Sequence, residues 1–158
     1  MDNKSRKERS ANMAAIRSEN TKPEMIVRRL LFEVGFRYRL HSKKLPGKPD
    51  IVLSKWKTIV FVNGCFWHMH ANCPRARLPT SNTAYWNLKL TRNQARDRRQ
   101  YSTLIALGWR IIVVWECACQ KNTLLSLQQA LVRIIRKKDT PCFIEIGKSE
   151  LEAPISFV

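Results

Sequence analysis

The stretch PDIVLSKWKTIVFVNGC, residues 49–65, contains two short apolar runs separated by a polar break. The runs, residues 50–53 and 58–62, are rich in the β-branched side chains that favour strands. The break at residues 54–57 is short, so we predict that the two strands form a hairpin or lie as adjacent central strands of a sheet. The Pro and Gly of LPGKPD, residues 45–50, indicate a turn before the first strand.

Periodicity predicts further elements on both sides of this stretch. Thr21 as N-cap, Pro23 in the first turn and Glu24 three residues after the cap mark a helix that ends near Val34, before Gly35. The other predicted elements are a half-exposed strand at 36–41, a helix from about 84 to 107 capped by Ser81 or Thr83, a buried strand at 110–115, an amphipathic helix at 122–138 and an edge strand at 141–147. This order predicts an α/β architecture, a mixed β-sheet with helices on both faces.

The chain is strongly basic, because 29 Lys and Arg residues against 12 Asp and Glu residues give a net charge of +17. Such a surface attracts a polyanion, and we expect nucleic acid; a charge that only aids solubility or ribosome association is the alternative. The 158 residues fit one domain, which we place at residues 21–158 after a basic DNA-contacting arm at residues 1–20. We expect no membrane partner, since the N-terminus does not resemble a signal peptide and every apolar run is too short to span a bilayer.

Carboxylates are scarce in the centre of the chain. Between residues 51 and 115, Asp97 is the single acid among ten Lys and Arg residues. Helical periodicity puts Asp97 on the apolar face of the predicted long helix, where it needs a partner, either an Arg in a structural pair or a histidine that it supports in catalysis. Asp50 starts a strand after a turn, close to a sheet end, where active sites of open α/β sheets gather. Glu24 is explained by the capping box; holding a water on a divalent ion is the alternative.

The loop after the second strand contains residues of the kind that bind metals. Cys65, His70 and Cys73 form the pattern C-x4-H-x2-C, which supplies three ligands for tetrahedral zinc, and Cys117 or Cys119 would supply the fourth. Five cysteines without a secretion signal indicate a reducing cytoplasm, where clustered Cys and His more often mean a metal than a disulfide. The alternative is that the cysteines are small buried hydrophobic residues beside a chance histidine.

The same loop contains a further histidine and two aromatic residues. His68 would point away from His70 in an extended segment, which leaves it free for acid–base work or a phosphate contact. Zinc would stiffen the loop, so that Phe66 and Trp67 could wedge between base steps of a duplex, with Trp86 joining them. Packing in the core is the alternative for these three rings.

Five motifs in a fixed order carry a resemblance to a known family. They are NMAAIRSENTKPE at 12–24, LPGKPDIV at 45–52, VFVNGCFWHMH at 60–70 followed by Cys73, ARDRRQ at 95–100 and LGWRIIVVWEC at 107–117. Over roughly residues 8–120 the chain resembles the very short patch repair (Vsr-type) DNA mismatch endonucleases. The resemblance implies a restriction-endonuclease-like fold with a structural Zn²⁺. It also implies Mg²⁺-dependent nicking of duplex DNA beside the thymine of a T:G mismatch left by deamination of 5-methylcytosine.

The resemblance assigns roles to individual residues. Asp50 is similar to the aspartate that binds Mg²⁺, the main-chain carbonyl of Val62 to the second protein ligand, and Glu24 to the acid that orients the attacking water. His68 and Asp97 resemble the histidine and aspartate near the scissile phosphate. The residues that align with the zinc ligands are Cys65, His70, Cys73 and Cys117, and those that match the intercalating aromatics are Phe66, Trp67 and Trp86.

Asn63 departs from the family pattern, which commonly has a histidine before the Gly-Cys of this loop. An asparagine can hydrogen-bond a water or phosphate but cannot take a proton at neutral pH. If that histidine is the base, its absence would lower the rate by roughly 10²–10⁴-fold. Two alternatives stay open: a zinc-stabilised mismatch-binding or DNA-binding protein with weak or no catalysis, and a related nickase with a different DNA target.

The expected partner is double-stranded DNA with a T:G mismatch, and other mismatch-repair proteins are further candidates. We expect a monomer in the bacterial cytoplasm, associated with the nucleoid.

Overall fold

The computed structural model describes residues 19–152, so the predicted arm at residues 1–20 lies outside the described residues except for Glu19 and Asn20. The helices and strands are α2 (Lys22–Glu33), β1 (Arg39–Leu40), β2 (Ile51–Leu53), β3 (Thr58–Asn63), α3 (Thr83–Ala106), β4 (Arg110–Trp115), α4 (Leu124–Arg136), β5 (Phe143–Ile146) and α5 (Lys148–Glu152). The strands form one sheet in the order β1-β2-β3-β4-β5. Because β1, β2 and β3 are antiparallel and β3, β4 and β5 are parallel, the predicted mixed sheet is confirmed.

The two apolar runs of residues 50–62 form a hairpin. Ile51 lies opposite Val60 and Leu53 opposite Thr58, so the two strands begin to pair directly after the polar break. The break is a 3-10 turn at Ser54–Trp56, followed by Lys57 in the left-handed conformation with φ +49°. Of the two arrangements that the sequence allowed, the hairpin is therefore the one present.

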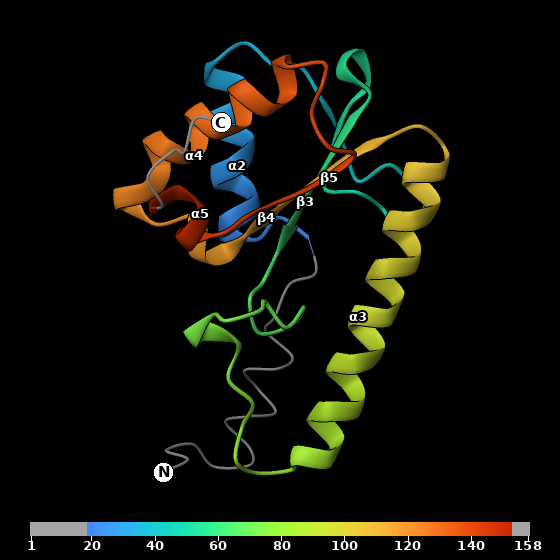
Figure 1. The fold of residues 1–158 in the computed structure, drawn as a ribbon, viewed down its shortest axis with the longest axis vertical. Helices are drawn as coiled ribbons and strands as arrows, with labels where there is room; N and C mark the ends of the chain where they lie inside the picture. The colour runs from blue at the N-terminus through green and yellow to red at the C-terminus, as the bar shows by residue number, and fades with distance from the viewer. Residues whose placement is uncertain (1–18, 153–158) are drawn as a thin grey trace.

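The parallel pair of β3 and β4 forms the centre of the sheet and brings distant residues together. The two strands end side by side, with Asn63 next to Trp115. Helix α3 is the connection between them, and it runs along one face of the sheet (Figure 1). The loop after β3 and the turn after β4 consequently meet at one end of the sheet.

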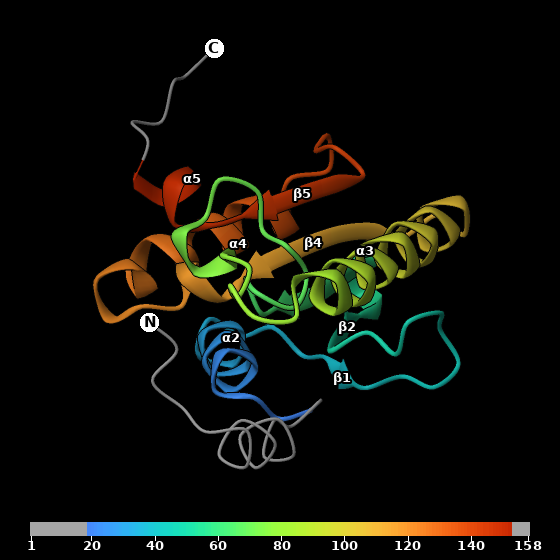
Figure 2. The same ribbon diagram turned by 90° about the horizontal axis from the view of Figure 1, so that it is seen from below.

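Helices cover both faces of the sheet, as predicted. Alternate side chains of the central strands enter two separate apolar clusters, because a strand points successive residues to opposite faces. Val60 and Val62 pack in the cluster that contains α2 and α4, whereas Ile59 and Phe61 pack in the cluster beneath α3. Figure 2 shows α2 and α3 over different faces of the twisted sheet.

Several predicted boundaries need correction. The half-exposed strand at 36–41 is only two residues long, because the chain pairs with β2 at Arg39 and Leu40 alone. Asn82, and neither Ser81 nor Thr83, is the N-cap of α3, and its side chain makes no capping hydrogen bond. The sequence did not predict α5. Among the described residues no helix combines the length and apolar character needed to cross a bilayer.

Candidate active site and metal centre

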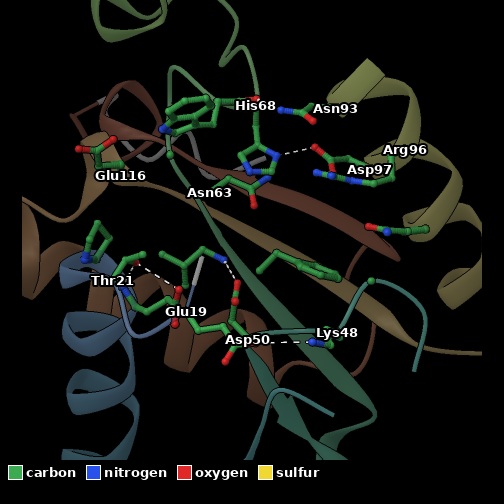
Figure 3. A pocket seen from close by; sticks show the side chains of 18 of the residues that line it. Glu19, Thr21, Lys48, Asp50, Asn63, His68, Asn93, Arg96, Asp97 and Glu116 are labelled. Atoms are coloured by element: carbon green, nitrogen blue, oxygen red, sulfur yellow. Dashed lines mark hydrogen bonds and ion pairs between the residues drawn. The ribbon is translucent and has the colours of Figure 1, made fainter. Parts of the chain in front are cut away.

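A cleft of about 860 Å³ lies between the start of α2, the segment before β2, the end of β3 and the middle of α3 (Figure 3). Its lining includes all five predicted catalytic residues, together with the residue predicted to bind Mg²⁺ through its carbonyl: Glu24, Asp50, Val62, Asn63, His68 and Asp97. These residues come from four separate parts of the chain. The fold therefore brings the predicted set together around one opening.

Asp50 lies at the inner wall of the cleft, directly before β2. Its Oδ2 accepts a hydrogen bond of 2.8 Å from the backbone N–H of Val62. Burial raises the pKa of Asp50 to about 7, although the Val62 N–H opposes that shift. A carboxylate held in this environment is better stabilised as an anion when a cation lies beside it.

The carbonyl of Val62 faces the same side as its N–H, since both groups of one residue project from the same edge of an extended strand. The β2–β3 ladder ends with Ile51 opposite Val60, and Pro49 and Asp50 precede β2 beside the end of β3. Proline has no N–H, so it cannot donate to that carbonyl. An oxygen acceptor and the Asp50 carboxylate thus lie at the same point of the sheet end, and hard oxygen ligands of this type suit Mg²⁺.

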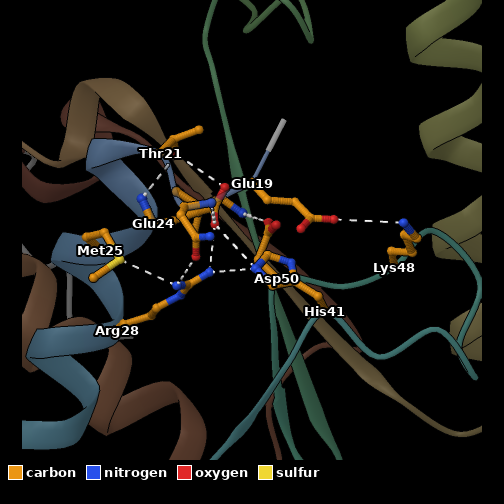
Figure 4. Close-up of polar contacts among 10 residues, drawn as sticks. Glu19, Thr21, Glu24, Met25, Arg28, His41, Lys48 and Asp50 are labelled. Carbon is orange, nitrogen blue, oxygen red and sulfur yellow. Dashed lines mark hydrogen bonds and ion pairs between the residues drawn. The ribbon is translucent and has the colours of Figure 1, made fainter. Parts of the chain in front are cut away.

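Glu24 is both a helix cap and a buried wall of the cleft, with 2% of its surface exposed. Its backbone N–H donates to Thr21 Oγ1 at 3.4 Å, as the capping box predicts. Its Oε2 accepts from the backbone N–H of Asn20 at 2.9 Å and from Arg28 Nη2 at 2.8 Å. The two explanations of Glu24 from the sequence, cap and functional acid, are therefore compatible (Figure 4).

Arg28 and His41 belong to this site and were not predicted. Arg28 is buried, and its Nη2 lies 2.7 Å from His41 Nε2, so His41 accepts that hydrogen bond as a neutral ring. Ligand atoms of Glu24, His41 and Asp50 lie within 4.8 Å of one another. The ion pair could have been predicted, because Glu24 and Arg28 are four residues apart on one helix. His41 gave no such signal, because its position depends on the turn after β1.

His68 and Asp97 form a close pair across the cleft. Asp97 Oδ2 lies 2.5 Å from His68 Nδ1, and Asp97 Oδ1 lies 3.3 Å from Arg96 Nη2. Asp97 is 8% exposed and Arg96 is a surface residue, whereas His68 is half-buried. Of the partners that the sequence allowed for Asp97, the histidine makes the shorter contact. A carboxylate at Nδ1 fixes the tautomer and leaves Nε2 as the other reactive nitrogen.

Asn63 is held by Tyr101 of α3, a residue that the sequence analysis did not single out. The Asn63 side-chain amide donates to the hydroxyl of Tyr101 at 2.9 Å. Burial raises the pKa of Tyr101, so this phenol is neutral. The carbonyl oxygen of Asn63 is the remaining polar atom of a side chain that lines the cleft.

Cys65, His70, Cys73 and Cys117 form a second group, with their ligand atoms within 4.8 Å of one another. His70 Nδ1 lies 3.6 Å from Cys65 Sγ and 3.5 Å from Cys117 Sγ. Tetrahedral zinc bonds of about 2.0–2.3 Å would separate neighbouring ligand atoms by roughly 3.5–4 Å, so this spacing fits zinc. Burial raises the pKa of the Cys65 and Cys117 thiols, and thiolates would persist here beside a cation.

One detail of the sequence interpretation is wrong at this group. The segment from Cys65 to Met69 is a series of turns and is not extended, because His68 N–H bonds to Gly64 O and Met69 has φ +53°. His68 and His70 nevertheless have different partners, since His68 contacts Asp97 and His70 contacts two cysteine sulfurs. Cys117 and Cys119 do not share a strand, because a 3-10 turn, Glu116–Ala118, follows β4. Cys119 Sγ instead contacts Trp115 O at 3.9 Å, outside the group of four.

Phe66, Trp67 and Trp86 lie in contact, although loop and helix supply them separately. Ring centroids are 5.1 Å apart for Phe66 and Trp67 and 5.3 Å apart for Phe66 and Trp86. All three rings are half-buried and belong to neither core cluster. Lys89 Nζ lies 5.3 Å from the Trp67 ring centre, and Asn93 donates to Trp67 O at 3.2 Å. Half-buried rings at the edge of the cleft are available for contact with a ligand.

Comparison with known proteins identifies the family of this chain. A family model described as DNA mismatch endonuclease Vsr matches residues 1–75. The chain is 46% identical over 129 residues to the type II nicking enzyme V.NmeAIP of Neisseria meningitidis serogroup A, covering 82% of this chain and 90% of the relative. It is 42% identical over 110 residues to the DNA mismatch endonuclease Vsr of Escherichia coli strain K12, covering 70% of each chain. The chain belongs to the Vsr family.

Membership of the Vsr family makes the protein a DNA endonuclease and confirms the resemblance that the five motifs indicated. A further relative is the type II nicking enzyme V.XorIIP of Xanthomonas oryzae pv. oryzae, which is 50% identical over 105 residues, or 66% of this chain and 76% of the relative. These Vsr relatives include one named for mismatches and others named for nicking. The family therefore establishes the reaction on DNA, while the target of this chain is a separate question.

Proposed function

We propose that the protein is a Mg²⁺-dependent endonuclease that nicks duplex DNA at a T:G mismatch, in very short patch repair of deaminated 5-methylcytosine. The observation that carries this proposal is the convergence of Glu24, Asp50, His68 and Asp97 on one cleft. In a chain with a net charge of +17, acids gathered at one opening indicate chemistry more than affinity for DNA.

Asp50 and the carbonyl of Val62 would hold the Mg²⁺ ion. The support is the sheet end described above, where the carboxylate accepts a hydrogen bond from the N–H of Val62 and the preceding Pro49 has no N–H to donate. When bound, Mg²⁺ would act as a Lewis acid on the scissile phosphate. Glu24, held by Arg28 and the backbone of Asn20, would orient the attacking water.

His68 would exchange a proton with the scissile phosphate or the leaving oxygen. Asp97 accepts the proton of Nδ1, which directs the reactive lone pair or proton of His68 to Nε2. Asn63 would accept a hydrogen bond from water through its carbonyl oxygen, because Tyr101 already accepts from its amide. In this arrangement His68 is the proton carrier and Asn63 a binding residue.

The group of Cys65, His70, Cys73 and Cys117 would hold a structural Zn²⁺ that fixes the loop between β3 and α3. The rings of Phe66 and Trp67 project from that loop and contact the ring of Trp86, so a stiff loop would present three rings together. Such rings would enter the base stack beside a mispair, where unstacking costs less than in matched duplex. We also propose that the protein acts as a monomer, because one chain supplies the whole cleft, and that other repair proteins are its partners.

Strand scission of a labelled duplex with one T:G mismatch tests this function. The measurement uses the full chain with and without Mg²⁺, beside the matched duplex of the same sequence. We expect nicking of the thymine strand at the mismatch only, and only with Mg²⁺. Binding without scission under all conditions would overturn the proposal.

A nickase with another DNA target is the second candidate, since relatives of this chain are named type II nicking enzymes. Mg²⁺-dependent nicking of matched duplex at least as fast as of the T:G duplex would favour this candidate. It retains the roles of Asp50 and His68 and changes only the recognition.

Asn63→His tests the departure from the family pattern. A histidine could assist as a base, and we expect the single-turnover rate to rise by about tenfold or more. An unchanged rate would show that His68 alone supplies the proton transfer that limits the reaction.

A further inference from the structure

The segment Gly147–Glu150, which leads from β5 into α5, lies against the Cys/His group. The backbone N–H of Lys148 donates to Cys117 Sγ at 3.4 Å. Hydrogen bonds to sulfur stabilise a thiolate and so support its role as a ligand. This contact joins the C-terminal part of the described chain, which is outside the motifs of residues 12–117, to the residues of the proposed zinc site.

Gly147 packs directly on the imidazole of His70. A Cβ atom placed on Gly147 would lie 2.7 Å from His70 Cε1 and 3.0 Å from His70 Nε2. It would also lie 2.7 Å from Glu150 Oε2. The far edge of the His70 ring and the Glu150 carboxylate therefore meet at one residue that has room for no side chain.

The Glu150 carboxylate is fixed in this position by its own segment. Oε2 accepts from the backbone N–H of Gly147 at 2.8 Å and from Ser149 Oγ at 3.0 Å. The opposite face of His70 stacks on Trp115, with ring centroids 4.2 Å apart and planes at 10°. The imidazole is thus enclosed by Trp115 on one face and by Gly147 and Glu150 at its far edge, while Nδ1 faces the sulfurs.

We propose that Gly147–Glu150 is a clasp that completes the surroundings of the Cys/His group and slows the release of its metal. Lys148 N–H supports the Cys117 thiolate, and the Glu150 carboxylate, which accepts from Gly147 N–H and Ser149 Oγ, holds the backbone of Gly147 against the His70 ring. Groups that surround metal ligands and orient them change metal affinity by about 10–100-fold. The clasp rests on the proposed binding of zinc by this group.

Lys148→Pro removes the N–H that bonds to Cys117 Sγ, and proline is tolerated at the first position of a helix. Lys148→Ala is the matched control, since it keeps the N–H and loses only the side chain that pairs with Glu152. The measurement is the rate at which zinc-loaded full-length protein releases zinc to an excess of a chromophoric chelator. We expect release about tenfold faster for Lys148→Pro and an unchanged rate for Lys148→Ala.

Glu150→Gln tests independently the carboxylate that holds Gly147 against His70, and it keeps the size of the side chain. Its matched control is Glu152→Gln on the same helix, which removes the same charge and pairs with Lys148 instead. Release about tenfold faster for Glu150→Gln alone supports the clasp. If Lys148→Pro does not fold, as judged by circular dichroism, this second pair decides the question.

The two possible failures are distinguishable by metal analysis. Purified wild-type protein that neither contains nor binds zinc overturns the proposed zinc site, and the clasp with it. Wild-type protein that contains one zinc ion, together with Glu150→Gln and a folded Lys148→Pro that both release it at the wild-type rate, overturns the clasp and leaves the zinc site in place.

Discussion

The cleft and the Cys/His group lie on either side of one loop, yet they differ in whether protein groups stabilise their charged side chains. In the cleft, protein groups already compensate two of the acids: Arg28 pairs with Glu24, and His68 pairs with Asp97. In the Cys/His group, Cys65 and Cys117 are buried in an apolar cluster, and their thiols resist ionisation. The difference teaches that the cleft can fold before any ion binds, whereas the proposed zinc ion would itself be part of the fold.

The largest effect should follow the loss of a zinc ligand. Cys65→Ser should abolish zinc binding and lower the melting temperature by more than about 10 °C, because structural zinc contributes about 10 kcal/mol or more to small sites. Thermal unfolding, with metal analysis of the same sample, measures both. Cys142→Ser is the control, since Cys142 is exposed and should leave both values unchanged. A wild-type melting temperature for Cys65→Ser would remove the contrast between the two regions.

Replacement of Asp50 should affect chemistry and leave the fold intact. Asp50→Ala should reduce the nicking rate by about 10³-fold or more, because it removes a proposed ligand of the catalytic ion. The melting temperature should move by only a few degrees, and affinity for duplex DNA should be retained. Glu19→Gln, at the exposed mouth of the cleft, is the matched control. Nicking by Asp50→Ala near the wild-type rate would rule out this metal site.

A smaller effect on rate is expected from the pair across the cleft. Asp97→Asn keeps the shape of the side chain but removes the charge that fixes the tautomer of His68, so nicking should fall by about 10²-fold. Single-turnover rates on the T:G duplex provide the measurement, and zinc content should not change. Asp139→Asn, on an exposed turn, should behave as wild type. Equal rates for both variants would make Asp97 a structural residue only.

The smallest effect concerns the rings that join the two regions. Trp67→Ala should weaken binding to the T:G duplex by about 1–3 kcal/mol, the usual contribution of one stacked base, and should weaken binding to matched duplex less. Equilibrium binding to both duplexes gives the comparison. Phe32→Ala, an exposed ring on α2, is the control. An equal loss for both duplexes would show that Trp67 contributes to affinity and not to recognition of the mismatch.

Local patterns predicted most of the fold. Residues 50–62 form the two predicted strands because β-branched runs, a polar break and a Pro-containing turn all favour them, and the hairpin is one of the two arrangements predicted. The helix at Lys22–Glu33 follows its cap in the same way. The length of β1 could not be predicted, because it depends on how far β2 extends beside it. The helix α5, which follows an edge strand, could not be predicted because it is too short to show a helical pattern of apolar residues.

The candidate site was predictable where residue type limited the choice, and not where partners were distant in sequence. Carboxylates, cysteines and histidines in an otherwise basic segment are conspicuous, so Asp97, His68 and the metal ligands could be named. The choice between Cys117 and Cys119 depended on a 3-10 turn that no local pattern announced. The contact between Tyr101 and Asn63 could not be predicted, because the two residues lie on either side of the crossover from β3 to α3.

That crossover also sets the order in which the protein can mature. Strands β3 and β4 pair in parallel only after the chain has supplied all of α3, and parallel pairing of distant segments is intrinsically slow. Asp50 and Asp97 meet, and Cys65 meets Cys117, only through this pairing. A ribosome-bound chain that ends before β4 therefore has neither a complete cleft nor a complete set of four metal-type ligands. The cleft that would cut DNA is therefore complete only late in synthesis.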